Sequence, residues 1–431
     1  MGSQQYKIRL SLRYSAGMAK EETYDVIVIG GGASGMFAAG VAGKRGKKVL
    51  LLEKNKALGE KLKISGGGRC NITNAEYDTH ALLAHYGEGG KFLFSPFSQF
   101  GVKDTFSYFE ERSLPLVVQA RKRAFPNTEK AFDVYATLKK ELDKTKVAVQ
   151  TNCTITDIVA ENKKIVRVET NRGVFHASSY ILSTGGVSHP ETGSTGDGFK
   201  FLKNIGHTVK NPTPTIVPLA VAEEWVKMLA GVSLSFMKIT FFLEDQKVFS
   251  KTGKVLFTHF GLSGPLILNS AGKVGGMLEG GNVRAVIDAY PDTDLGALEK
   301  TILSTFNSSK NKSLKNVFKD ICPAGTAKGI QTLLPDIDFE TKVHSVSKED
   351  RKKIVRLLKT LPVTITNLMG YDRAVLADGG VLMTEIDTKT MRSLLFQNLY
   401  ITGDLLHINR PSGGYSLQLC WTTGFVAGSH A

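Results

Sequence analysis

The chain has 431 residues, a length at which one hydrophobic core is unusual, so the sequence predicts two or more domains. Hydrophobic residues make up 42% and charged residues 22%, which is typical of soluble globular proteins. The formal net charge of +15 is spread along the chain with only short basic clusters, which favours a basic surface over a nucleic-acid face. Four scattered cysteines without a C-x-x-C pair argue against a disulfide framework, a metal site and a redox-active disulfide, and they indicate a reducing cytoplasm.

The N-terminal segment is set apart from the fold. Residues 1–20 carry basic side chains, no acid, and no apolar stretch long enough for a secretory signal. We interpret residues 1–22 as a leader or tag, with three origins left open: an added tag, a start upstream of a natural Met18, or a transit-like leader. We expect this segment to be disordered.

Residues 24–53 have the pattern of a dinucleotide-binding unit. The β-branched run at 26–29 is typical of a strand buried on both faces, and three glycines follow it at G-x-G-x-x-G spacing. In such a unit Gly30 permits the tight turn, Gly32 lets the backbone approach a diphosphate, and Gly35 lets the helix pack on the strand. The alternative is a glycine-rich turn that only packs. A membrane-spanning segment is excluded because residues 26–43 are short and rich in glycine.

The remainder of this unit supplies polar contacts for a nucleotide. We expect a helix from the turn to about Arg45, with the N–H groups of Ala33 and Ser34 facing the phosphate charge. A second strand at 48–52 ends on Glu53, which can accept hydrogen bonds from an adenosine ribose. Lys54, directly after it, is included among the expected cofactor contacts.

The segment 58–74 is predicted to be a loop, because it is too rich in glycine for a helix and too polar for a core strand. Lys61 and Arg69 can neutralise phosphate, and Asn71 can hydrogen-bond a ring edge. Gly66 and Gly67 would let the backbone approach a ligand closely. A surface loop with a glycine turn is the alternative. The neighbouring Cys70 is included in the cofactor contacts, although such a cysteine is more often a small buried residue.

The middle of the first half mixes helices and strands. Residues 101–145 are predicted to be helical, with one polar connection at 121–127. Residues 147–159, 165–170 and 174–181 are predicted to be three strands of a meander that ends near Thr184 and Gly185. Asp197 is the expected N-cap of a helix over 199–205.

Composition changes at 211–218, where two X-Pro pairs force extended backbone and indicate a domain crossing. Beyond it we predict a β-rich stretch at 236–243, and a hairpin in which 248–250 pairs with 255–258 across a turn at 251–254. Helical patterns fill about 294–360. Leu361-Pro362 closes that block, and strands return up to 399–402.

The C-terminal segment favours FAD over a nicotinamide as the resident dinucleotide. A strand at 399–402 is followed by Gly403-Asp404 and by a helix that opens at Gly413-Gly414. A flavin extends beyond its diphosphate and has to be held from elsewhere in the sheet, and Asp404 can hydrogen-bond its ribityl chain. The positive end of the helix would face the ring, with Tyr415 as a wall of the pocket. A strand and helix that only complete the sheet are the alternative.

With these motifs in order, the chain resembles the aminoacetone oxidase/BaiN-like family of FAD-dependent flavoproteins. The resemblance covers nearly everything from 24 to 428 and includes the RAFP motif at 123–126, HPETGSTGDG at 189–198 and LFTHFGLSGP at 256–265. It implies an α/β fold, a Rossmann-like FAD-binding domain of the glutathione-reductase type split by a β-barrel plus helical insertion. The expected limits are 23–208 and 368–431 for the FAD domain and 209–367 for the insertion.

The resemblance also carries expectations about individual residues. It implies that Glu53, Lys61, the glycine pairs and the residues around Ile155 surround a non-covalently bound FAD. One departure stands out: where the family pattern reads G-E-x-L-D-x-D-G, His407 and Asn409 replace carboxylates. Substrate or proton-transfer chemistry carried by those acids is therefore in doubt.

These observations lead us to expect a cytoplasmic FAD-dependent oxidoreductase that transfers a hydride at flavin N5 to or from a small organic substrate. Two chemistries stay open: amine oxidation with oxygen, and nicotinamide-dependent reduction of a conjugated double bond. The chain has no second G-x-G-x-x-G, so NAD(P)H would dock transiently over the flavin. His259 and Tyr415 are the catalytic candidates, against structural roles for both. A binding or redox-sensing protein with a nucleic-acid or protein partner is the rival from another class.

Overall fold

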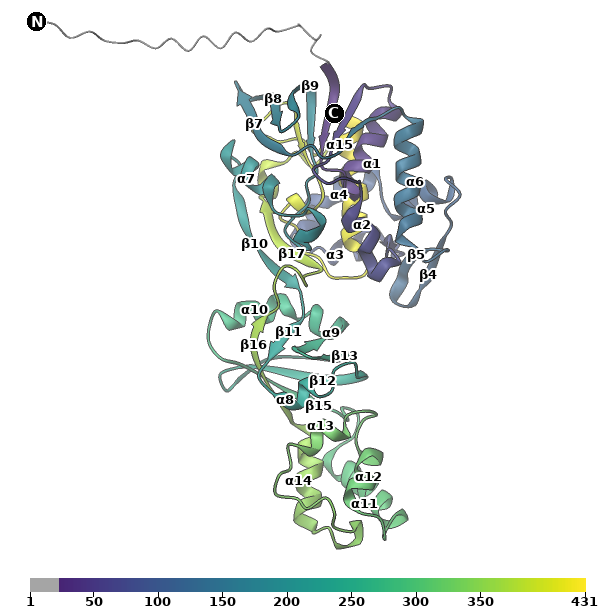
Figure 1. Cartoon of the computed structure of the whole chain (residues 1–431), viewed down its shortest axis with the longest axis vertical. Coiled ribbons are helices and arrows are strands. Elements are labelled where there is room, and N and C mark those ends of the chain that lie inside the picture. Colours follow the sequence, from purple (N-terminus) through teal and green to yellow (C-terminus); the bar gives the residue numbers. More distant parts are fainter. Residues whose placement is uncertain (1–22) are drawn as a thin grey trace, which may run out of the picture.

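The computed structural model describes residues 23–431, and the expectation for the leader at 1–22 lies outside them. The molecule is elongated and has three tiers: an α/β domain, a β-barrel below it, and a group of helices at the far end of the barrel (Figure 1). No helix within 23–431 is long and apolar enough to cross a membrane. In that same range no cluster of three or more His, Cys, Asp or Glu side chains is arranged to hold a metal. All four cysteines are free.

A seven-stranded sheet with the order β6-β2-β1-β9-β8-β7, in which β18 also pairs with β9, forms the α/β domain. The strands β6, β2, β1, β9 and β18 run parallel, whereas β7, β8 and β9 form an antiparallel meander. The strands of this sheet are β1 (Thr23–Ile29), β2 (Val49–Leu52), β6 (Ala148–Gln150), β7 (Ile155–Glu161), β8 (Lys164–Thr170), β9 (Gly173–Leu182) and β18 (Leu399–Ile401).

Helices cover this sheet, and a small β3-β5-β4 sheet lies beside it. The first helix and the C-terminal helix pack against each other, which brings the two ends of the domain together (Figure 1). The remaining elements are α1 (Ala33–Lys44), α2 (Glu60–Ile64), α3 (Thr79–Ala84), α4 (Gly89–Gln99), α5 (Val102–Glu110), α6 (Ala131–Lys144), α7 (Asp197–Asn204), α15 (Tyr415–His430), β3 (Thr73–Asn74), β4 (Leu116–Gln119) and β5 (Arg123–Pro126).

An antiparallel ribbon of β10 (Val209–Ile216) and β17 (Leu376–Val381) leads out of this domain and back. Beyond it lies a closed barrel with the strand order β11-β14-β13-β12-β15-β16. Its strands are β11 (Leu219–Val221), β12 (Ser233–Leu243), β13 (Gln246–Thr258), β14 (Gly261–Ser263), β15 (Val283–Asp288) and β16 (Leu361–Leu368). The helices of the insertion are α8 (Glu224–Lys227), α9 (Pro265–Leu268), α10 (Ala271–Leu278), α11 (Leu295–Ser308), α12 (Leu314–Ile321), α13 (Ala327–Gln331) and α14 (Lys348–Lys359).

Two separate hydrophobic cores support these parts. One core draws on residues 24–202 and 381–431, and the other on residues 217–374. In the first, Val26, Ile27 and Val28 are fully buried, as expected of a central parallel strand. The predicted α/β fold with an antiparallel-sheet insertion is therefore confirmed.

The predicted hairpin at 248–258 is wrong. Residues 246–258 form one continuous strand, β13, and the turn lies earlier, between Leu243 and Gln246 at the end of β12. Gly253, read as a turn residue, has another role: a Cβ atom there would lie 3.3 Å from Cβ of Leu266. This glycine lets α9 pack closely on the strand.

Three local predictions in the α/β domain also need correction. The expected strand at 147–159 is two strands. The first, β6, pairs with β2, and the second, β7, pairs with β8 in the meander. The expected loop at 58–74 contains α2 and a 3₁₀ turn at 65–68. The polar connection at 121–127 contains β5, and β4, which pairs with it, replaces the helix predicted at 116–119.

Asp197 is not an N-cap. Gly196, with φ of 79°, precedes α7, and Asp197 is the first residue of the helix itself. Its carboxylate accepts a hydrogen bond from Lys54 Nζ at 2.8 Å. The aspartate therefore ties the loop after β2 to the start of α7.

Candidate functional site

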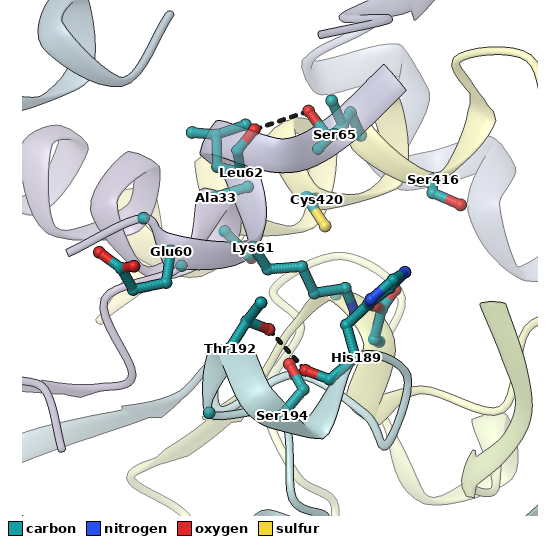
Figure 2. A pocket seen from close by; sticks show the side chains of 18 of the residues that line it. Ala33, Glu60, Lys61, Leu62, Ser65, His189, Thr192, Ser194, Ser416 and Cys420 are labelled. Carbon is teal, nitrogen blue, oxygen red and sulfur yellow. Dashed lines mark hydrogen bonds and ion pairs between the residues drawn. The ribbon is translucent and has the colours of Figure 1, made fainter. Parts of the chain in front are cut away.

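A cavity of about 600 Å³ lies at the carboxyl ends of the parallel strands β1, β2, β9 and β18. This edge is where open α/β sheets bind their ligands. Figure 2 shows the side chain of Lys61 extending from α2 across the cavity towards His189. Nearly all of the lining belongs to the α/β domain. The barrel contributes Pro265 and Leu268 of α9.

The three glycines of the first turn have distinct physical roles. Gly30 has φ of 101°, and a Cβ atom there would lie 2.6 Å from the backbone oxygen of Ser183. A Cβ atom on Gly35 would lie 1.9 Å from the backbone oxygen of Gly30, so only glycine lets α1 pack on β1. Gly32 differs, because its backbone (φ −80°) suits any residue and a Cβ atom would meet nothing within 4 Å. No protein atom therefore requires glycine at this position, where the open space lets a ligand approach the backbone.

Polar groups in the cavity wall point to a bound dinucleotide as well. Ser34 and Thr184 belong to the lining, and their hydroxyl oxygens are buried without a hydrogen-bond partner within residues 23–431. The N–H groups of the first turn of α1 also have no intrahelical acceptor, because the first helical bond runs from Met36 N to Gly32 O. A diphosphate at the N-terminus of α1 would satisfy these N–H groups.

Glu53 ends β2 and lines the cavity, but the protein already uses both of its carboxylate oxygens. Oε2 accepts from Gly31 N at 2.7 Å and Oε1 accepts from Asn55 N at 2.8 Å. Burial raises the pKa of Glu53, against the opposing effect of these N–H groups and of Lys54. The carboxylate therefore holds the glycine turn in place, and its remaining lone pairs are available to a ribose.

The chain beside Glu53 forms the neighbouring end of the cavity. Cys153 N donates to Glu53 O at 2.9 Å, which places the start of β7 next to the acid. Thr154 and Ile155 follow in the lining, as does Lys54. The predicted position of Ile155 at the cofactor cavity thus agrees with the lining.

The N-terminus of α15 faces the same cavity from the opposite direction. Gly413 and Gly414 have φ of 124° and 101°, and a Cβ atom on Gly414 would lie 2.2 Å from the carbonyl carbon of Thr73. With its amide oxygen turned towards Gly414 N, at 2.9 Å, Asn71 joins the two segments. The glycine pair therefore allows β3 and α15 to meet at the cavity wall.

A chain of charges runs along the wall beside Gly403. Lys61 Nζ donates to Ser188 Oγ at 2.8 Å and to Asp404 Oδ2 at 3.2 Å, and Arg410 Nη2 donates to Asp404 Oδ1. Burial by itself would raise the pKa of Asp404, but Lys61 and Arg410 outweigh it and lower the pKa. Asp404 is therefore ionised at neutral pH and fixed between two cations.

Arg69 reaches the cavity from the 3₁₀ turn, near Gly66 and Gly67. Its guanidinium carbon lies 4.3 Å from the ring centroid of Phe125, and its Nη2 donates to Gln119 Oε1 at 2.8 Å and to Glu129. The carboxylate of Glu129 and the ring of Phe125 therefore share this cation. Arg69 is less available for a phosphate than the sequence implied.

Four of the predicted residues lie outside the lining. Gly35 acts through packing, as described above. Cys70 is fully buried, and burial raises the pKa of its thiol to about 12. Tyr415 is buried against His85 and Tyr86, and its carbonyl accepts from the Tyr86 hydroxyl at 2.8 Å.

His259 is the fourth. It is exposed in the turn between β13 and β14, where its ring contacts Phe260. The structure does not bring it to the cavity. The other predicted contacts line it together: Gly30, Gly32, Ala33, Ser34, Glu53, Lys54, Lys61, Gly66, Gly67, Arg69, Asn71, Ile155, Thr184, Gly185, Gly403, Asp404, Gly413 and Gly414.

Several lining residues were missed by the sequence reasoning. His189 occupies the start of the HPETGSTGDG motif, with its Nδ1 2.7 Å from Glu191 Oε1, and it was read only as part of a glycine loop. Pro265 is the last residue of the quoted LFTHFGLSGP motif and Leu268 follows three residues later, so the end of the motif, rather than His259, marks the cavity. No sequence signal marked Cys420, whose pKa burial raises to about 12.

Comparison with known proteins identifies the family. The profile described as "HI0933-like protein Rossmann domain" matches residues 24–430. The chain belongs to the HI0933-like family. Members of this family are FAD-dependent oxidoreductases, so this flavoprotein is an FAD-dependent oxidoreductase.

Two relatives and one solved structure illustrate the range of the family and of its fold. One relative is the 3-dehydro-bile acid delta(4,6)-reductase of Clostridium scindens, with 29% sequence identity to this chain. The alignment covers 94% of this chain and 98% of the reductase. Another relative is the ribosomal RNA dihydrouridine synthase of Escherichia coli, with 28% sequence identity. The alignment covers 94% of this chain and 97% of the synthase. A flavocytochrome c3 fumarate reductase in its open conformation is similar in fold, with a TM-score of 0.51 and 16% identity over 95% of this chain and 78% of that chain.

Proposed function

We propose that this flavoprotein reduces a carbon–carbon double bond conjugated to a carbonyl group, with NAD(P)H as the hydride donor. The names of two relatives carry the proposal, because a delta(4,6)-reductase and a dihydrouridine synthase both add hydrogen to a double bond. A steroid enone and the uracil ring share that group, a C=C polarised by a neighbouring carbonyl. Of the two chemistries left open by the sequence, this one is favoured over amine oxidation.

Each part of the cavity wall has a role in this proposal. The N-terminus of α1 and the open face at Gly32 would hold the diphosphate of FAD, with Glu53, Thr154 and Ile155 at its adenosine end. The N-terminus of α15, at Gly413 and Gly414, would face the flavin ring. FAD supplies the capacity to accept a hydride from a donor and pass it to the polarised double bond.

The other residues around the ring would cover it and supply a proton. Pro265 and Leu268 provide an apolar cover from the barrel, which excludes water from the reacting atoms. Reduction of a conjugated double bond also requires a proton at the carbon next to the carbonyl. His189 is the histidine that lines this cavity, and Glu191 holds its Nδ1. We assign the proton transfer to His189 rather than to His259.

A two-step experiment tests the proposal on the purified, FAD-loaded protein. The flavin is first reduced anaerobically with NADH, NADPH or aminoacetone and followed at its absorption band. The reduced protein is then mixed with a steroid enone, a uridine-containing RNA or oxygen. We expect rapid reoxidation by a conjugated acceptor, with the saturated compound as product.

His189→Gln is expected to slow reoxidation by the conjugated acceptor about 10²-fold or more without loss of FAD. His259→Gln is the matched control, with the same substitution outside the cavity, and should behave as the unchanged protein. Reoxidation by oxygen alone, after reduction by an amine, would establish the oxidase chemistry instead. A flavin that no small molecule reduces would favour the binding or redox-sensing class.

A further inference from the structure

A second cavity, of about 540 Å³, lies at the junction of the α/β domain, the ribbon and the barrel. This volume is in the range of small-molecule sites. Its wall comes from the loop after α3, from β10 and β17, from the start of α10, and from the loop at 407–411. His407 and Asn409, where the chain departs from the G-E-x-L-D-x-D-G pattern, both line it. Neither lines the flavin cavity.

A line of three titratable groups crosses one side of this cavity. Lys210 Nζ lies 3.3 Å from His407 Nε2, and His407 Nδ1 lies 3.1 Å from Asp378 Oδ1. An ammonium group has no acceptor, so Lys210 donates and Nε2 accepts. His407 Nδ1 and Asp378 Oδ1 lie within ion-pair distance, but both atoms are buried and neither makes a hydrogen bond within residues 23–431. The imidazole lies between the Asp378 carboxylate and the Lys210 ammonium.

Lys210 is exposed, its side-chain contact is the His407 imidazole, and no carboxylate lies within salt-bridge distance of it among residues 23–431. Thr215 Oγ1, also in the wall, is buried without a partner in the same range. Lys273 and Arg410 also line the cavity, but Lys273 Nζ lies over the Phe249 ring and Arg410 is paired with Asp404. Glu88 and Asp378 add two acids to the lining. Asp378 is behind His407, and Glu88 is exposed. An anion beside Lys210 would supply the counter-charge that this ammonium lacks.

Only a thin wall separates the two cavities. Ser412, which lines the flavin cavity, donates from N and from Oγ to Asn269 Oδ1 at 3.3 and 3.2 Å, and Asn269 lines the second cavity. Arg410 lines the second cavity and donates to Asp404 in the flavin cavity. A ligand anchored in the second cavity therefore lies within reach of the flavin cavity across residues 410–412.

We propose that the second cavity is a phosphate-binding site for the diphosphate of the nicotinamide donor, with Lys210 and His407 as its contacts. The assignment to a donor rests on the proposed function, but the phosphate site itself does not. A nicotinamide dinucleotide carries its diphosphate at a distance from its reacting ring, and this chain has no second dinucleotide turn to hold it. The Lys210 ammonium, in a cavity next to the flavin cavity, would provide this anchor.

Inorganic pyrophosphate is the probe for the site, and calorimetry on the FAD-loaded protein measures its binding without any turnover. We expect Lys210→Gln and His407→Gln to weaken pyrophosphate binding at least 10-fold, and Lys210→Arg to retain it. Lys203→Gln is the charge-matched control, because Lys203 bonds Asn211 Oδ1 at 2.8 Å and does not line either cavity. FAD content and circular dichroism show that each variant is folded.

The donor assignment is tested separately by stopped-flow reduction of the flavin over a range of NADH and NADPH concentrations. Lys210→Gln should raise the apparent Kd of the donor at least 10-fold with the limiting reduction rate unchanged. Pyrophosphate binding that is absent, or equal in all variants, would overturn the phosphate site. Binding lost in Lys210→Gln with an unchanged donor Kd would overturn the donor assignment. If neither nucleotide reduces the flavin while the pyrophosphate results stand, the proposed function fails and the phosphate site remains.

Discussion

The α/β domain and the insertion contribute to the flavin cavity by different physical means. The α/β domain builds its share from backbone: glycine turns, strand ends and the N-termini of α1 and α15. The insertion, which has its own core, contributes two apolar side chains, Pro265 and Leu268. Backbone contacts at Gly30 and Gly35 allow no Cβ atom, whereas an apolar cover can be exchanged for another. We therefore expect cofactor binding and substrate choice to be separable.

The largest effect is expected from removing the cover. Replacement of the barrel and helices, 219–368, by a short turn would join the ribbon strands directly, since β10 and β17 already pair as far as Ile216 and Leu376. We expect FAD binding to persist and substrate turnover to be lost, because water reaches the flavin ring. Loss of FAD from a deletion variant that folds would show that the insertion belongs to the cofactor site.

Two glycines of the first turn sharpen the contrast between packing and ligand contact. Gly35→Ala places a Cβ atom against the backbone oxygen of Gly30, and we expect a loss of about 3 kcal/mol in the free energy of unfolding of the cofactor-free protein. Gly32→Ala meets no protein atom, so the cofactor-free protein should keep its stability. Its FAD affinity should fall instead. Urea unfolding and fluorescence titration measure the two quantities, and equal behaviour of the two variants would contradict the division of roles.

Glu53 offers a smaller test in the α/β domain. Its two oxygens each accept a backbone N–H, and glutamine has one acceptor oxygen for both, so Glu53→Gln leaves Gly31 N or Asn55 N unpaired. We expect FAD binding to weaken by about 1.5–3 kcal/mol, the value of a charge-assisted hydrogen bond. Glu53→Arg should weaken it further. Unchanged affinity in both variants would mean that neither the turn nor the ribose depends on this acid.

The smallest expected effect is on the pH dependence of stability, which we assign to a histidine of the α/β domain and not to the insertion. His207 in the α/β domain is buried, with Nδ1 2.6 Å from Glu385 Oε2 and Nε2 3.0 Å from Ser393 Oγ. Burial lowers the pKa of His207, although Glu385 opposes the shift, so the folded protein holds the ring neutral. The unfolded chain takes up a proton near its ordinary pKa of about 6.5, and stability should therefore fall as the pH drops below that value.

The expected contribution of His207 is at most about 1.4 kcal/mol per pH unit, the limit for one proton. Urea unfolding between pH 7.5 and pH 5.5 measures it. His207→Gln should flatten the dependence, whereas the same change at His344, which is exposed in the insertion, should not. A steep pH dependence that survives in His207→Gln would assign it to other groups.

The sequence predicted the α/β part of the cavity lining far better than the part that comes from the insertion. Gly30 and Gly35 act through backbone geometry and Glu53 through its carboxylate, all within one βαβ unit, and local spacing records such an arrangement directly. The approach of Pro265 to that unit depends on how the barrel sits on the ribbon, which no local pattern records. His259 was chosen for its chemistry, but chemistry alone does not reveal that its turn lies outside the cavity lining. Gly253 was misread because a glycine that makes room for a helix resembles one that makes a turn.

The pairing of α1 with α15 has a consequence for the order in which the protein assembles. A Cβ atom on Gly424 would lie 2.7 Å from Ser34 O, and one on Gly428 would lie 2.5 Å from Ala38 O, so the two helices touch along their backbones. The first turn of the cofactor site is thus completed by a segment synthesised hundreds of residues later. During translation the insertion, with its self-contained core, can fold first. The sheet of the nascent α/β domain stays incomplete until β18 and α15 have been synthesised. We therefore expect the chain to bind its cofactor only from that moment.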